Sequence, residues 1–141
     1  MRPPRGSATI EFALVLPLLL CFVAAAVDYS MLMRTAIAVA DAARAGATYG
    51  SLSVGNASGT SAIQAAALAA APGVTGLTAT AATTCQCADG SVVNCSGGNC
   101  SSGVVRMYVQ VTAKATVTAP FSYPQLPFGG AVIATATMRA Q

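Results

Sequence analysis

A single acidic residue interrupts a long apolar run near the start of the chain. The run extends from Ser7 to Val27, and Glu11 is its only charged residue. It matches the roughly 20 residues that a helix needs to cross a hydrocarbon layer about 30 Å thick. A carboxylate inside a membrane helix costs roughly 2.5 kcal/mol or more on insertion scales, so such an acid usually has a partner and a function. Glu11 is therefore the first candidate functional residue, and the chemistry it suggests is charge pairing.

Four cysteines, Cys85, Cys87, Cys95 and Cys100, form a second group of reactive side chains. Structural zinc sites usually use cysteines separated by two residues, whereas Cys85 and Cys87 are separated by one, so we expect no metal. Beyond a membrane span the compartment is oxidising, which favours two disulfides. A Cys85–Cys87 bond would close too small a ring. Two pairings remain: Cys87–Cys95 with Cys85–Cys100, or Cys85–Cys95 with Cys87–Cys100. We prefer the first, because nested bonds suit a hairpin that turns at Ala88–Gly90.

The other polar side chains offer little for catalysis. The chain has no histidine, and its only acids are Glu11, Asp28, Asp41 and Asp89, so general acid–base chemistry has few groups to use. The sequence contains no glycine-rich phosphate loop, no Ser-His-Asp set and no His-Glu-x-x-His motif. Its basic residues do not cluster as they do on a nucleic-acid-binding face. We therefore expect no enzyme, no cofactor and no nucleic-acid partner.

Composition and charge predict a membrane protein. Only 8% of residues are charged and the mean hydropathy is +0.64, whereas soluble domains contain about 25% charged residues. Arg2 and Arg5 precede the apolar run, and positive residues that flank a first span stay in the cytoplasm. We expect a single-pass protein with a cytoplasmic N-terminus and a domain on the far side of the membrane.

One long helix must position the acid in the apolar run. We expect it to extend from Ala8 to Tyr49, with a transmembrane half over 7–27 and an outer half over 28–50. Gly46 and Gly50 should weaken and end it. The outer half carries an apolar seam with spacings of three and four, suited to packing against a sheet and against sibling helices. The seam comprises Met33, Ile37, Ala40, Arg44 and Ala47.

The sequence pattern of residues 51–141 predicts an α+β domain outside the cytoplasm. A loop over 51–59 should lead to a short helix that Thr60 or Ser61 caps and that ends at Ala71. Three later segments alternate apolar and polar residues with a period of two, as strands do. These segments are 77–81, 105–118 and 132–139.

An antiparallel sheet that rests one face on a helix produces this alternation. The predicted fold is therefore α+β, with the long N-terminal helix packed on a small three-stranded antiparallel sheet and one short helix added. A disulfide-rich loop is expected at 85–100, and the proline-containing stretch 119–130 is expected to be an extended link.

The spacing of Gly6, Glu11 and Phe12 is similar to the processing pattern of Tad-type pilins and pseudopilins, in which a prepilin peptidase cuts after the glycine. The longer opening R-G-S-A-T-I-E-F-A-L-V-L-P-L-L-L resembles the TadE-like family. Two further patches, at 41–50 and 134–139, are also similar to that family.

This resemblance implies a pilin-like fold, a leader at 1–6 and a cleavage site between Gly6 and Ser7, completed by Glu11 and Phe12. The new amine of Ser7 would then pair with Glu11 of a neighbouring subunit during assembly. The implied protein is a membrane-anchored pseudopilin of a Tad or Flp pilus assembly and secretion system in a bacterial inner membrane. Its implied partners are the prepilin peptidase, an inner-membrane assembly platform, other pseudopilins and the major pilin.

Two other classes compete with this interpretation. A secreted or periplasmic binding domain would be released by signal peptidase, with Ala24–Ala26 as the small-residue cleavage site. A small periplasmic metal-binding protein would use the four cysteines. Glu11 near the start of the apolar run argues against the first class, and the spacing of Cys85 and Cys87 argues against the second.

Overall fold

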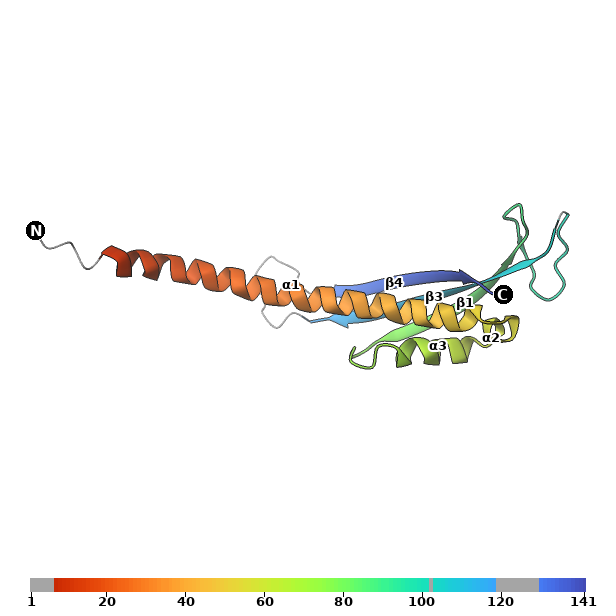
Figure 1. The fold of residues 1–141 in the computed structure, drawn as a ribbon, viewed down its shortest axis with the longest axis horizontal. Coiled ribbons are helices and arrows are strands. Elements are labelled where there is room, and N and C mark those ends of the chain that lie inside the picture. Colours follow the sequence, from red (N-terminus) through yellow and green to blue (C-terminus); the bar gives the residue numbers. More distant parts are fainter. Residues whose placement is uncertain (1–6, 102, 119–129) are drawn as a thin grey trace, which may run out of the picture.

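The computed structural model describes residues 7–101, 103–118 and 130–141. The leader at 1–6, with Gly6, and the link at 119–129 lie outside the described residues. Within these ranges the chain forms three helices and four strands. In chain order they are α1 (Ser7–Ser51), α2 (Val54–Ser58), α3 (Thr60–Ala69), β1 (Thr78–Gln86), β2 (Val92–Val93), β3 (Arg106–Val117) and β4 (Gly130–Arg139). Figure 1 shows that the first half of α1 extends alone beyond the sheet.

The four strands form one antiparallel sheet with the order β2-β1-β3-β4. The α+β class and the antiparallel sheet are confirmed, but the prediction of three strands is wrong. The fourth strand is β2, which places Val93 opposite Cys85 and Val92 opposite Gln86. Two residues are too few to show an alternating pattern, and they lie in a stretch rich in glycine and serine, so periodicity could not detect them.

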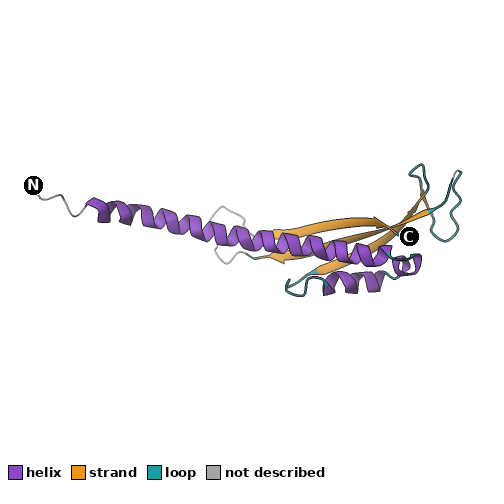
Figure 2. Ribbon diagram, viewed as in Figure 1, coloured by secondary structure: helices purple, strands orange, loops and turns teal. Residues whose placement is uncertain are grey.

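The core lies between one face of the sheet and the two helices α1 and α3, which run side by side over it (Figure 2). Alternate residues of β3 point into this core and are buried, whereas those between them face solvent or are half-buried. The buried set is Val109, Val111, Ala113, Ala115 and Val117. The period-two pattern of the sequence therefore identified the buried face of β3 correctly.

The buried face of α1 matches the predicted seam only in part: Ala47 is buried as predicted, whereas Arg44 is exposed. The buried positions follow a helical spacing and include Val39, Ala42, Ala43 and Ala47. Met33 and Ile37 lie outside this stripe, with 39% and 62% of their surface exposed. Alanine occurs on every face of this helix, so apolar spacing alone does not select the face that packs on the sheet.

Two glycines of α1 have a different role from the one predicted. The helix does not end at Gly50 but continues to Ser51. A Cβ at Gly46 would lie 3.0 Å from the Ala67 Cβ, and a Cβ at Gly50 would lie 2.8 Å from the Val109 Cγ1. These glycines therefore allow α1 to approach α3 and β3 more closely than any residue with a side chain would.

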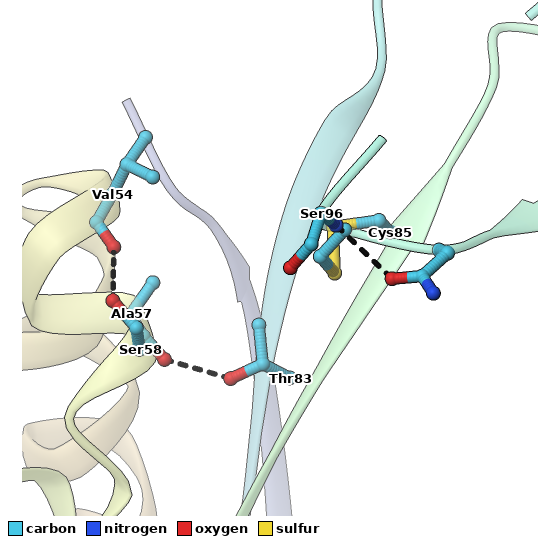
Figure 3. Close-up of a disulfide and its surroundings, with 8 residues drawn as sticks. Val54, Ala57, Ser58, Thr83, Cys85 and Ser96 are labelled. Carbon is cyan, nitrogen blue, oxygen red and sulfur yellow. Dashed lines mark hydrogen bonds between the residues drawn. A yellow bond between two sulfur atoms is a disulfide. The ribbon is translucent and has the colours of Figure 1, made fainter. Parts of the chain in front are cut away.

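The predicted loop at 51–59 contains the short helix α2, which begins where the Ser53 hydroxyl accepts a hydrogen bond from the Asn56 amide at 3.1 Å. The Thr83 hydroxyl of β1 donates to the Ala57 carbonyl at 2.7 Å and ties α2 to the sheet (Figure 3). The next helix, α3, was predicted, but its N-cap is Gly59 and no side chain caps it.

Candidate functional site

The N-terminal end of α1 carries the predicted processing and assembly residues. Ser7 is the first residue of the helix, and Glu11 and Phe12 follow within its second turn. Residues four apart lie on the same face of a helix, about 6 Å apart along its axis, so one face carries both Ser7 and Glu11. Glu11 is exposed, as is Phe12.

The first half of α1 presents apolar side chains that no other described element covers. Exposed residues occur all around it; they include Ile10, Leu14, Leu18, Leu19 and Phe22, each more than half exposed. Large exposed apolar surfaces mark sites of contact with a membrane or another protein. Among the described residues, α1 is the one helix long and apolar enough to cross a membrane. This agrees with a single-pass membrane protein.

Asp28 was not among the predicted site residues. It directly follows the predicted span and is only 3% exposed. Neither carboxylate oxygen has a hydrogen-bond partner in the described part of the chain. A buried carboxylate without a partner is costly. Asp28 precedes Val39 by 11 residues, or three helical turns, so it lies on the sheet-facing stripe, and this spacing is the sequence signal that could have revealed it.

All four candidate cysteines are paired in the structure. Cys85 bonds to Cys95 with their Cα atoms 5.2 Å apart, and Cys87 bonds to Cys100 with their Cα atoms 5.6 Å apart. This is the second of the two pairings that the sequence allowed, so the preference for nested disulfides was wrong. Figure 3 shows the Cys85 disulfide beside β1.

The register of the β1–β2 hairpin explains the pairing. Cys85 lies opposite Val93, and the Cys87 amide donates to the Ser91 carbonyl across the turn at 2.9 Å. Cys95 is therefore two residues beyond the position opposite Cys85, but four residues beyond the position opposite Cys87. At about 3.3 Å per residue along a strand, Cys85 is the nearer partner.

The hairpin turns where it was predicted to turn. The Gly90 amide donates to the Cys87 carbonyl at 3.0 Å, and Gly90 has a φ of 87°, a conformation that glycine adopts readily. The Asp89 carboxylate accepts hydrogen bonds from the hydroxyl and the amide of Ser91 at 2.7 and 3.0 Å. The hydroxyl bond first, and then the amide bond, lower the pKa of the Asp89 carboxyl from its usual value.

The cysteine-rich loop is therefore an ordered element at the end of the domain opposite the free half of α1 (Figure 1). Its side chains suit a structural or contact role. In the part of the chain that the structure describes, no three His, Cys, Asp or Glu side chains come together as a metal site would require.

Comparison with known proteins adds one result. Residues 6–48 match the model of the family described as TadE-like protein. No curated protein and no solved structure matches the chain. The matched residues begin at the predicted cleavage glycine and end three residues before the end of α1. The chain therefore carries a TadE-like segment at residues 6–48, which confirms the resemblance first indicated by the spacing of Gly6, Glu11 and Phe12.

Proposed function

We propose that this chain is a membrane-anchored pseudopilin, a subunit similar to minor pilins, of a Tad or Flp pilus assembly and secretion system. One observation carries the proposal. The TadE-like segment at 6–48 coincides with α1, whose exposed apolar first half continues without interruption into the core of an α+β domain. The proposal assigns the chain no catalytic role.

The two halves of α1 have opposite surroundings. This difference supports a membrane-spanning role for the first half and a packing role in the domain core for the second. Apolar side chains such as Leu14 and Phe22 are exposed in the first half, whereas Val39 and Ala43 are fully or almost fully buried against the sheet in the second. Because both halves belong to one helix, insertion of the first half would hold the domain at a fixed distance from the membrane.

Charge and redox chemistry support one orientation. Arg2 and Arg5 precede the span, and such residues remain on the cytoplasmic side. The disulfides Cys85–Cys95 and Cys87–Cys100 belong to the domain that follows the span, and disulfides persist in the oxidising compartment outside the cytoplasm. We therefore place the N-terminus in the cytoplasm of a bacterial cell and the domain in the periplasm or outside the cell.

Glu11 has the central mechanistic role in this proposal. Cleavage between Gly6 and Ser7 gives Ser7 a free amine, and α-amino groups have a pKa near 8, so most of it is charged at neutral pH. A carboxylate and an ammonium are each costly in an apolar environment, and each satisfies the other when they pair. The Ser7 amine of one subunit would pair with Glu11 of its neighbour.

This pairing would set the axial offset between neighbouring subunits. The surrounding apolar side chains, such as Leu14 and Leu18, can slide past one another with little change in energy. A single polar pair in an apolar interface has one favoured register, which is the best-attested use of buried polar groups. The partners in this assembly would be a prepilin peptidase, an inner-membrane assembly platform, other pseudopilins and the major pilin.

The Glu11→Ala variant tests the proposal. We expect it to insert into the membrane and to be cut after Gly6, but not to assemble. Breaking a buried ion pair costs about 3–5 kcal/mol, so recovery of crosslinked complexes with the assembly platform should fall by roughly a hundredfold or more. Leu14→Ala is the matched control, because it shortens an exposed side chain of the same half-helix without removing a charge.

Both variants are followed by crosslinking, by co-purification with the platform and by a processing assay. Assembly of Glu11→Ala at the wild-type level would contradict the pairing role and leave Glu11 as, at most, a residue that the peptidase recognises. An equal loss of assembly in Leu14→Ala would show that the half-helix needs its packing rather than its charge.

A further inference from the structure

A polar pocket opens at the end of the domain that faces the free half of α1. It has a volume of about 300 Å³, and a second hollow of about 260 Å³ shares four of its residues and extends it along α1. Three segments contribute: α1, the connection between α3 and β1, and the end of β3. The lining residues are Met31, Arg34, Thr35, Gly73, Val74, Thr75, Thr116, Val117 and Thr118.

The sheet leaves this corner unfilled because its strands differ in length. β1 begins at Thr78 opposite Lys114, whereas β3 continues to Val117. Among the described residues, the last three positions of β3 therefore have no β1 residue beside them. The chain reaches β1 through a connection that contains Gly73, where a Cβ would meet no atom within 4 Å. Among the described residues, none fills this corner.

The pocket has the character of an anion site. Arg34 is exposed and forms no ion pair within the described ranges, whereas Arg44 on the same helix pairs with Asp41 at 3.8 Å. Of the described residues that line the pocket, none is acidic. Four threonines line the pocket together with Arg34, and no hydrogen bond of the Thr75 or Thr116 hydroxyl occurs within the described ranges. Guanidinium and hydroxyl groups together match the donors that phosphate oxygens require.

The position of Arg34 along α1 identifies the source of the phosphate. Arg34 lies seven residues, or about 10 Å, beyond Val27, the last residue of the predicted span. The headgroup layer occupies roughly 5–7 Å on each side of the hydrocarbon core. Helical side chains point back toward the helix N-terminus, which for α1 is toward the membrane. With the span ending at Val27, the guanidinium would therefore lie at the height of the lipid phosphates.

We propose that this pocket binds the phosphate of a lipid headgroup in the leaflet from which the domain emerges. Arg34 and the threonine hydroxyls would hold the phosphate, and Met31 and Val74 would contact the apolar part of the lipid. The bound lipid fixes the height and rotation of the domain above the membrane before the subunit meets its partners. This inference rests on the membrane anchoring in the proposed function.

The test is native mass spectrometry of the full chain in detergent with added phosphatidylglycerol. We expect Arg34→Gln to retain the lipid about tenfold less well than the wild type, since a charge-assisted hydrogen bond is lost. Thr75→Val keeps the side-chain shape and should weaken retention severalfold. Arg44→Gln is the matched control, because it removes an equal charge from the same helix outside the pocket, and it should retain lipid like the wild type.

Four results would overturn the proposal. Equal retention by Arg34→Gln and the wild type would show that the pocket does not hold the lipid, and an equal loss in Arg44→Gln would show only general electrostatic attraction. Displacement of the lipid by millimolar inorganic phosphate would identify a site for the free anion. If Arg34→Gln prevents assembly but leaves lipid retention unchanged, the pocket binds an acidic group of a partner protein. Because the measurement uses the isolated chain, its failure leaves the pseudopilin proposal standing. Normal assembly of Glu11→Ala would contradict the pairing role but leave the lipid site standing, since that result does not test membrane anchoring.

Discussion

Gly50 occupies a position where the protein has no room for a side chain. A Cβ there would lie 2.8 Å from the Val109 Cγ1 and 3.1 Å from the Ile63 Cδ1, and both residues are fully buried. Gly50→Ala would gain up to about 1 kcal/mol from helix propensity, but overpacking of a filled core costs about 1–3 kcal/mol. We expect the clash to dominate and the free energy of unfolding to fall by about 1 kcal/mol or more.

Denaturant unfolding of the purified protein in detergent measures this change. Gly73→Ala is the control, because no atom lies within 4 Å of its added Cβ, and it should alter the free energy of unfolding by less than about 0.5 kcal/mol. If Gly50→Ala proves as stable as the wild type, α1 and β3 are not in close contact at this position.

At the level of single elements, the disulfide pairing gives a sharp prediction. Cys95→Ser should leave Cys85 as the new free thiol, and Cys100→Ser should leave Cys87 free, because these are the bonded pairs. Maleimide labelling without reductant, followed by peptide mass spectrometry, identifies the labelled cysteine. The variants are best made together with Cys21→Ser, since Cys21 is the free cysteine of the described chain.

The nested alternative makes the opposite prediction for the same variants. Under nested pairing, Cys95→Ser would release Cys87. Labelling of that residue would therefore contradict the register of the β1–β2 hairpin. Labelling of all four loop cysteines in a protein altered only at Cys21, prevented by added zinc, would instead favour a periplasmic metal-binding protein.

The same elements show what sequence patterns can and cannot predict. β3 was predictable because its 12 residues alternate through its whole length. The disulfide partner of Cys85 was not predictable, because it depends on the register of β1 against β2. A two-residue strand such as β2 carries no periodic signal in the sequence. The buried face of α1 was predicted correctly at Ala47 but not at Met33 or Ile37, since alanine on all sides leaves the choice of face to packing against β3.

The residues of the candidate site also differ in whether the sequence alone could predict them. The TadE-like segment that begins at Gly6 was predictable because the spacing of Gly6, Glu11 and Phe12 is a local property of the sequence. Arg34 was not predictable as part of a site, because the pocket around it arises only when α1 packs against distant segments.

At the scale of the whole molecule, the domain depends on α1 for its core, and the first half of α1 is long and apolar enough to cross a membrane. Val39, Ala42 and Ala43 come from α1 and pack with residues of the sheet in one cluster. The first half, with residues such as Leu14, has no such cover. Under the proposed function the chain would keep its anchor after removal of residues 1–6, whereas cleavage within the alanines at 24–26 would separate the domain from the membrane.

The most direct test of the central claim is the N-terminal mass of the mature protein. The full chain is expressed with and without a prepilin peptidase, extracted from membranes and measured as an intact protein. We predict that the peptidase removes Met1–Gly6, that the mature chain begins at Ser7 and stays in the membrane fraction, and that Gly6→Ala remains uncut. A mature chain that begins near Val27 and appears in the soluble fraction would contradict the account and favour a secreted domain released by signal peptidase.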